Sequence, residues 1–173
     1  ALGLRAGYVA RLREVRAAEG GGVVVVDAGD AFQGTLESNL AEGAGVIDAY
    51  RAMGVGALAI GNHEFDFGPV GKRSTPSGPG DDPRGALKAL SLRVSHATPD
   101  WPNVRPSVVV TVAGVRLGLV GLSTADTLTT TIAANVADLA MAPAAPALTA
   151  EARRLRDEER ADAVVAVTHL GGK

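Results

Sequence analysis

Gly61-Asn62-His63-Glu64-Phe65-Asp66 follows the apolar run 57–60, and this stretch predicts both the fold and the place of a site. A buried strand that ends in an amide, an imidazole and two carboxylates is costly to fold, because desolvated polar groups need partners. A metal ion or an anionic substrate is the usual reason to assemble so many polar groups. The stretch therefore predicts a functional site at the end of a strand.

Two other apolar runs end in the same way. The run 23–26 is followed by Asp27-Ala28-Gly29-Asp30, and the run 163–167 is followed by Thr168-His169. Short continuous runs of branched residues are typical of strands buried on both faces in a parallel sheet. Ligands bind beyond the carboxyl ends of such strands. We therefore expect Asp30, Asn62, His63 and His169 to meet at one edge of a sheet, with Gly29 and Gly61 allowing sharp turns there.

The donor atoms of these residues suit a divalent metal. Carboxylate, amide oxygen and imidazole bind manganese, zinc, iron or calcium. Each residue alone has an ordinary structural interpretation: Asp30 as an Asx-turn residue, Asn62 as a turn cap, and His169 as a core histidine whose ring is hydrogen-bonded. Their repeated placement at strand ends favours ligands over these interpretations, whereas Asp27 is interpreted as a turn or capping residue.

Composition limits the possible classes of protein. With 173 residues, the chain is expected to form a single domain over 1–173 with one core. A net charge of −2 gives no electrostatic reason to expect nucleic acid or a membrane surface as a partner. The absence of cysteine excludes disulfides, thiolate catalysis and Cys-ligated zinc. No apolar run approaches the roughly 20 residues of a membrane span. No signal peptide is expected within this sequence, because the chain opens inside a predicted amphipathic helix, which suggests a fragment.

The alternation of patterns predicts an α/β layered fold with an added antiparallel hairpin. Helices are expected at 4–19, 36–53 and 84–90, and a fourth from an N-cap at Thr149 to about 160. Strands are expected at 23–27, 57–60 and 162–167, with a hairpin formed by 108–112 and 115–122. The Gly- and Pro-rich segment 68–85 is interpreted as a flexible loop, and 123–148 as irregular.

Three blocks of this chain resemble, in order, the signature blocks of calcineurin-like metallophosphoesterases. They are Gly29-Asp30-Ala31-Phe32-Gln33-Gly34-Thr35, Gly61-Asn62-His63-Glu64-Phe65-Asp66 and Val167-Thr168-His169-Leu170-Gly171. More narrowly, they look like the bacterial 5′-nucleotidase and UDP-sugar hydrolase branch, as does 121–127 after the hairpin. The similarity runs over nearly the whole chain.

The resemblance implies a two-metal hydrolase on a four-layer α/β/β/α sandwich, acting on a nucleotide or nucleotide-sugar phosphate. Asp30 would bridge two divalent metal ions (Mn, Zn, Fe, Ca or Mg), and Asn62 and His169 would ligate the second. His63 would stabilise the transition state over the phosphoryl group, with Asp66 orienting its imidazole. Two such ions can activate a water and clamp the phosphoryl group. The expected partner is a small-molecule phosphate ester, and the family suggests an exported location, periplasmic or extracellular.

The chain departs from the family pattern in several places. An Asp-x-His at the end of the family's first strand would precede Ala1, and a Gly-His-x-His block would follow Lys173. The family's usual Phe-Pro-like entry, strand and Ala-Asn pair are missing between Leu87 and Trp101, so either the chain is shortened there or its sequence joins segments across a gap. The family's nucleotide-binding C-terminal domain has no counterpart in these 173 residues. This chain alone is therefore expected to bind metal weakly and to be inactive. The alternative is a catalytically silent fragment or binding module that retains part of the metal site. A relative in the branch hydrolyses thiosulfate linkages, so the resemblance does not determine which type of bond is hydrolysed.

Overall fold

A computed structural model describes residues 2–31, 33–40, 43–67, 104–137 and 139–171 of the chain. The predicted loop 68–85, the predicted helix 84–90 and the unusual segment 87–101 lie outside these residues. No helix among the described residues is long and apolar enough to cross a membrane.

Helices and strands alternate along the described chain, which confirms a mixed α/β fold. The longer helices are α1 (Leu2–Ala18), α3 (Ala44–Met53) and α7 (Ala144–Asp157), and the shorter ones are α2 (Leu36–Leu40), α5 (Thr127–Thr130) and α6 (Ala133–Val136). The strands are β1 (Val25–Asp27), β2 (Val55–Leu58), β3 (Ser107–Val112), β4 (Val115–Ser123) and β5 (Ala163–His169), and a 3₁₀ turn, η1, spans His63–Phe65.

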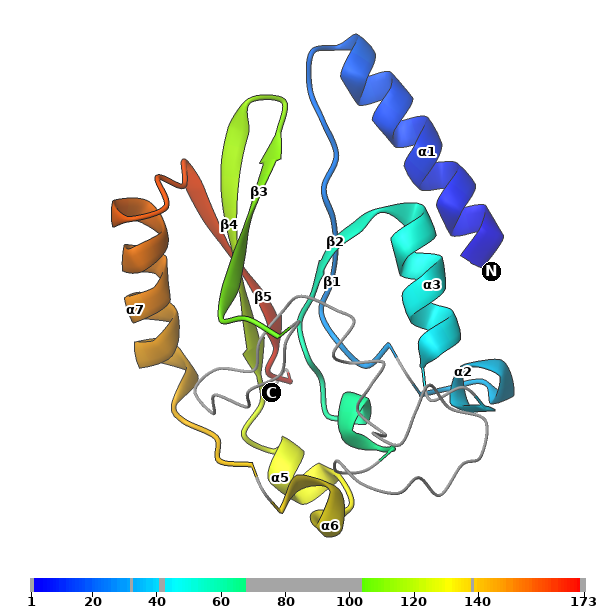
Figure 1. Cartoon of the computed structure of the whole chain (residues 1–173), viewed down its shortest axis with the longest axis vertical. Helices are drawn as coiled ribbons and strands as arrows, with labels where there is room; N and C mark the ends of the chain where they lie inside the picture. The colour runs from blue at the N-terminus through cyan, green and yellow to red at the C-terminus, as the bar shows by residue number, and fades with distance from the viewer. Residues whose placement is uncertain (1, 32, 41–42, 68–103, 138, 172–173) are drawn as a thin grey trace.

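The strands form two sheets. Strands β1 and β2 pair in parallel, whereas β4 pairs antiparallel with β3 and parallel with β5. In Figure 1, α7 lies on the outer side of the three-stranded sheet, and α3 and α1 lie on the outer side of the two-stranded sheet. The full four-layer sandwich stays a prediction.

Small and branched apolar residues fill the space between the two sheets. Ala57 of β2 and Leu119 of β4 are both buried, and they pack with the apolar side chains Val24, Val108, Val110 and Leu117. On the other side of β4, a Cβ added to Gly118 would lie 2.8 Å from Leu155 of α7, so the helix packs closely against the strand. A separate cluster below the strand ends contains Ile47, Ile60, Phe65, Val104 and Val136.

The predicted strands need correction in their burial and their ends. Strands β1 and β5 are not buried on both faces in the described chain, since Val26 is 40% exposed and Val165 41% exposed. The predicted strand 57–60 is also shifted by two residues at both ends, because β2 spans Val55–Leu58. Ala59 and Ile60 are fully buried nonetheless. The apolar run 57–60 therefore indicates burial and not strand pairing. The hairpin is confirmed as β3 and β4, and β5 runs on to His169.

Three helix predictions also need correction. The predicted helix 36–53 is two helices, because Gly43 before α3 has a φ of 86° that a continuing helix cannot accept. The tract 123–148 is not irregular throughout, since it contains α5, α6 and the start of α7. Thr149 is not an N-cap: it lies inside α7, where its hydroxyl donates to the Ala145 carbonyl at 2.9 Å.

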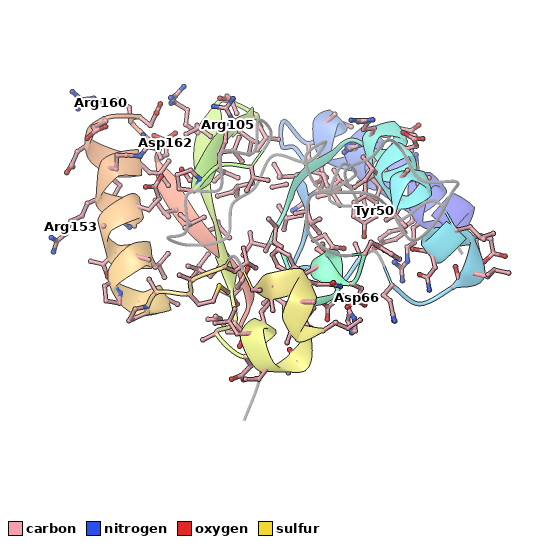
Figure 2. All side chains as sticks on the ribbon, turned by 60° about the horizontal axis from the view of Figure 1, so that its bottom comes forward. Tyr50, Asp66, Arg105, Arg153, Arg160 and Asp162 are labelled. Atoms are coloured by element: carbon pink, nitrogen blue, oxygen red, sulfur yellow. The ribbon has the colours of Figure 1, made fainter. Side chains whose placement is uncertain are left out.

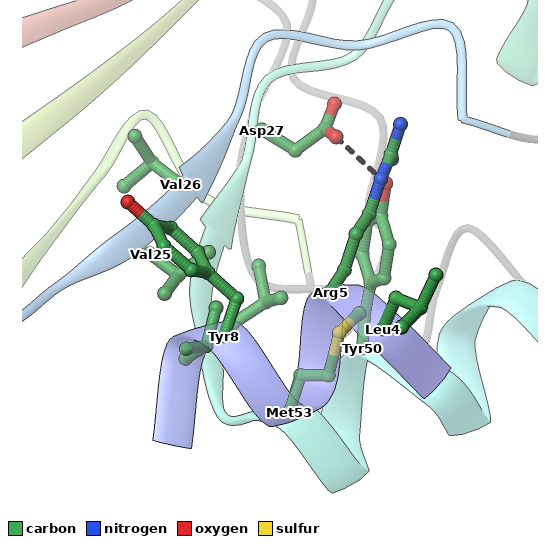
Figure 3. A pocket seen from close by; sticks show the side chains of 10 residues that line it. Leu4, Arg5, Tyr8, Val25, Val26, Asp27, Tyr50 and Met53 are labelled. Atoms are coloured by element: carbon green, nitrogen blue, oxygen red, sulfur yellow. Dashed lines mark hydrogen bonds between the residues drawn. The ribbon is translucent and has the colours of Figure 1, made fainter. Parts of the chain in front are cut away.

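A cavity of about 430 Å³ lies between α1, β1, β2 and α3. Its walls are mostly apolar, and Figure 3 shows Tyr50 of α3 pointing at Asp27 of β1. The Tyr50 hydroxyl donates to Asp27 Oδ2 at 2.6 Å, while Asp27 Oδ1 accepts the Gly29 N–H at 2.8 Å. Burial, with the Asp27 carboxylate, raises the pKa of Tyr50, so the hydroxyl stays a donor. Asp27 thus has the turn role that the sequence predicted, and it also ties β1 to α3.

Tyr50→Phe is expected to lower the free energy of unfolding by about 1.5–3 kcal/mol, because it removes a hydrogen bond to a charged carboxylate. Urea denaturation measures the change. Tyr8→Phe is the matched control, since Tyr8 lines the same cavity and its exposed hydroxyl has no partner among the described residues. That variant is expected to stay within about 0.5 kcal/mol of the native protein. Equal effects of the two substitutions would contradict the role given to Tyr50.

Candidate functional site

The ends of three strands bring Asp30, Asn62 and His169 together. His169 Nε2 lies 3.2 Å from Asp30 Oδ2 and 3.3 Å from Asn62 Oδ1. The sequence placed these residues at one edge of one sheet. The structure instead takes Asp30 and Asn62 from the turns after β1 and β2, and His169 from the end of β5 in the other sheet. The residues meet because the two sheets pack with their strand ends on the same side.

The turn that carries Asp30 has an unusual backbone. Gly29 has a φ of 101° and Asp30 a φ of 61°, both in the left-handed region. Glycine is required at position 61 for a different reason from the sharp turn that the sequence predicted. A Cβ at Gly61 would lie 2.2 Å from Asp30 Oδ1 and 2.6 Å from the Asp30 nitrogen. Gly61 therefore allows the two turns to pack backbone against backbone.

Gly61→Ala is expected to lower the free energy of unfolding by about 1–3 kcal/mol, because the added methyl group overlaps Asp30 and forces the turns apart. Gly45→Ala is the matched control: Gly45 lies in α3, and a Cβ there would meet nothing within 4 Å. It is expected to leave stability unchanged or raise it by up to about 1 kcal/mol, as Ala favours helix over Gly. Thermal or urea denaturation of both variants measures the difference. A Gly61→Ala protein as stable as Gly45→Ala would exclude the close packing described.

The contacts of His169 leave acceptor atoms facing one another. Its Nδ1 lies 3.0 Å from the Ala28 carbonyl, which can only accept, so Nδ1 carries a proton. In the neutral imidazole, the lone pair of Nε2 then faces one oxygen of Asp30 and one of Asn62. The Nε2 lone pair and these two oxygens repel unless a cation or a proton lies between them. The arrangement fits part of a divalent-metal site.

The ligand set is partial within the part of the chain that the structure describes. Among those residues no three His, Cys, Asp or Glu side chains gather as a metal-binding group. Asp30 and His169 are two such side chains, and Asn62 adds an amide oxygen. A complete two-ion site needs further donors beyond these three.

His63 and Asp66 form a second unit beside this set. His63 Nδ1 and Asp66 Oδ2 are 2.6 Å apart, and the imidazole remains 39% exposed. The hydrogen bond to Asp66 raises the pKa of His63, against a smaller effect of burial. The His63 backbone N–H donates to Asp30 Oδ1 at 3.0 Å, which places the imidazole next to the candidate ligands. With Nδ1 held by Asp66, Nε2 is the ring nitrogen left for a bound molecule.

The segment from β4 to α6 supports the turn that carries these residues. Asn135 of α6 donates to the backbone carbonyls of Phe65 and Asp66 at 3.1 and 3.0 Å. The Thr131 hydroxyl donates to the Asn62 carbonyl at 3.2 Å, and the Ser123 hydroxyl donates to the Ile60 carbonyl. Figure 2 shows Asp66 beside this segment and away from Arg153 and Arg160 at α7. Sequence reasoning missed these contacts, because it interpreted 123–148 as irregular.

Glu64 is the main residue whose role sequence reasoning missed. In the sequence it is one of two carboxylates in the motif, and no function is predicted for it. Its side chain is buried, and it accepts hydrogen bonds from the backbone N–H groups of Asp30, Ala31 and Gly61. Burial raises the pKa of Glu64, and these three N–H donors oppose that effect. The signal available in the sequence was the position of Glu64 beside an apolar residue, Phe65, in a polar turn.

Known proteins resemble this chain in sequence and in fold, although no protein-family model matches it. A 5′-nucleotidase of Diplobatis ommata is 32% identical over 124 residues, which cover 68% of this chain and 20% of the relative. The crystal structure of a 5′-nucleotidase precursor from Thermus thermophilus has a TM-score of 0.64 and 26% identity, covering 86% of this chain and 28% of that one. A calcineurin-like phosphoesterase, YfkN from Bacillus subtilis, has a TM-score of 0.69 at 17% identity, covering 97% of this chain and 53% of that one.

The chain spans only about a fifth to a quarter of the length of the first curated relatives that it matches. The feature shared with the solved structures is the α/β fold. By sequence the chain is a relative of the 5′-nucleotidases, and its fold is that of a calcineurin-like phosphoesterase.

Proposed function

We propose that the protein carrying this chain is a metal-dependent phosphoester hydrolase of the 5′-nucleotidase type, acting on a nucleotide or nucleotide-sugar phosphate. The observation that supports this most directly is the position of His169 Nε2, which lies 3.2 Å from Asp30 Oδ2 and 3.3 Å from Asn62 Oδ1. A single domain over residues 1–173, an exported location and a small-molecule phosphate ester as partner belong to the same proposal.

Asp30, Asn62 and His169 would hold divalent metal through a carboxylate, an amide oxygen and an imidazole nitrogen. Bound divalent metal would supply Lewis acidity at the phosphoryl group and an activated water. Nδ1 of His169 donates a hydrogen bond to the Ala28 carbonyl. This bond fixes the tautomer in which the lone pair of Nε2 is available to a metal.

His63 and Asp66 would act on the substrate rather than on the metal. Asp66 holds Nδ1 of His63 and so sets the direction of the ring. Nε2 of His63 can then donate a hydrogen bond to a phosphoryl oxygen as negative charge develops there. Preorganised donors of this kind are a major source of transition-state stabilisation.

A second candidate function is a catalytically silent binding module. The observation in its favour is the partial ligand set: among the described residues, no three His, Cys, Asp or Glu side chains form a metal-binding group. Such a module would keep the fold and bind a divalent ion or phosphate ester weakly, without turnover.

The test measures Mn²⁺ binding by calorimetry and phosphate release from AMP and a UDP-sugar, for the 173-residue chain and for the longest protein that carries it. We expect metal-dependent phosphate release from the longer protein, lost in His169→Ala. The chain alone is expected to bind Mn²⁺ weakly and to turn over far below the enzyme median of about 10 s⁻¹. Mn²⁺ binding without turnover in either protein would favour the silent module. Metal-independent turnover, or no Mn²⁺ binding in either, would refute the proposal.

A further inference from the structure

One buried carboxylate holds the backbone of both turns that carry candidate ligands. Glu64 is 1% exposed. Its Oε2 accepts hydrogen bonds from the N–H groups of Asp30 at 2.9 Å and Gly61 at 2.6 Å, and its Oε1 accepts one from Ala31 at 2.6 Å. An ionised carboxylate offers about four lone-pair positions and no donor. It is therefore suited to a place where three N–H groups from separate turns converge.

Two of these N–H groups determine the conformation of Asp30. They belong to the peptide groups on either side of the Asp30 Cα, so holding both restricts φ and ψ of that residue. The φ of Asp30 is 61°, in the left-handed region that Asp and Asn adopt more readily than other residues with a side chain. Hydrogen bonds on both sides of the Cα hold Asp30 in this sparsely populated conformation. Glu64 supplies this restraint, and the backbone conformation sets the direction of the Asp30 carboxylate.

The restraint is reciprocal between the two turns. Asp30 Oδ1 accepts the N–H of His63, the residue next to Glu64, at 3.0 Å. This bond holds Oδ1 toward the second turn, while Oδ2 lies 3.2 Å from His169 Nε2. Each turn thus uses its own carboxylate to hold the backbone of the other, and only the Asp30 carboxylate also reaches His169.

We propose that Glu64 is a positioning residue that sets the direction in which Asp30 presents Oδ2 to His169. Glu64 acts through the backbone of Asp30 and not on the metal or the substrate. Its effect on metal binding rests on the proposed function, whereas its effect on the contact between Asp30 and His169 does not.

Two variants and one control test this role. Glu64→Gln keeps the size of the side chain but replaces one acceptor oxygen with an NH₂ group, which faces an N–H group and repels it. Glu64→Asp keeps the charge and shortens the side chain, so it cannot reach all three N–H groups. Glu151→Gln is the control, since Glu151 is a largely buried glutamate that binds Ser107 and Arg154 between β3 and α7.

The first measurement is ¹⁵N NMR of the metal-free 173-residue chain. In Glu64→Gln we expect the backbone resonances of Asp30, Ala31 and Gly61 to shift, and with them the ring nitrogens of His169, which lies in the other sheet. A purely structural role would move the backbone signals and leave the His169 ring unchanged. The second measurement is Mn²⁺ affinity in the longest protein that carries the chain. It is expected to fall about 10–100-fold, as for other groups that orient metal ligands. Glu151→Gln should change neither quantity.

Each outcome decides the proposal. Unchanged His169 ring resonances in a folded Glu64→Gln protein would overturn the positioning role, whatever the activity of the native protein. If Glu64→Gln does not fold, Glu64→Asp is judged by the same ring resonances. If Glu64→Gln shifts the His169 ring resonances but binds Mn²⁺ with native affinity, the effect of Glu64 on metal binding is refuted. If the native protein binds no Mn²⁺, the proposed function fails, and the NMR comparison alone decides whether Glu64 positions Asp30.

Discussion

Asp30→Asn is expected to lower divalent-metal occupancy and turnover together, each by more than the 10–100-fold typical of groups that only orient a ligand. The substitution removes the negative charge and one of the two oxygens suited to bridging metal ions. Asn tolerates the left-handed backbone found at this position, and its remaining oxygen can still accept the His63 N–H. Elemental analysis for metal, beside steady-state kinetics on AMP, measures both losses in a protein that keeps its fold.

The other substitutions at acidic positions separate charge from backbone effects. Asp30→Ala is expected to show the same loss of metal with an added stability cost of about 1–2 kcal/mol, because Ala is unfavourable at a positive φ. Asp48→Asn is the control for a change of charge, since Asp48 forms an exposed pair with Arg51 on α3. It should leave metal content and kinetics native. Full metal occupancy in Asp30→Asn would remove Asp30 from the ligand set.

His63→Ala is expected to lower kcat by about 10²–10³-fold while metal content and KM stay nearly native. The reason is that His63 is proposed to donate a hydrogen bond that strengthens only in the transition state, whereas Asp30, Asn62 and His169 hold the metal. The backbone N–H of residue 63 remains in this variant, so its bond to Asp30 is kept. The decisive measurement is elemental analysis of the same samples that are used for kinetics.

Asp66→Asn is the matched variant for the orientation of His63. It replaces the carboxylate that lies 2.6 Å from His63 Nδ1 with an amide. A milder decrease in kcat than that of His63→Ala is expected, because the imidazole remains but is less well held. If His63→Ala instead empties the metal site, His63 is a ligand, and the division of roles proposed for this turn is wrong.

The sequence by itself determined the fold class, the order of the main elements and the family. Apolar runs that end in polar residues predicted β1, β2 and β5, and a Gly-containing pair between two branched runs predicted the hairpin of β3 and β4. These signals are local, because burial and strand preference are recorded residue by residue. The same logic placed Asp30, Asn62 and His169 at strand ends, and the structure brings their side chains together. Their roles as ligands remain predictions.

The tertiary structure decided what depends on contacts between distant segments. The sequence did not show that Asp30 and His169 come from two different sheets, that Gly61 is needed for close packing against Asp30, or that α6 supports the turn carrying Asp66. Glu64 is the clearest case. The sequence alone indicates no function for it, yet in the fold it is buried and accepts hydrogen bonds from three backbone N–H groups. A carboxylate binds a metal or the backbone according to which groups surround it. For Glu64 those groups include Asp30 and Ala31, more than 30 residues away along the chain, and only the folded structure brings them close.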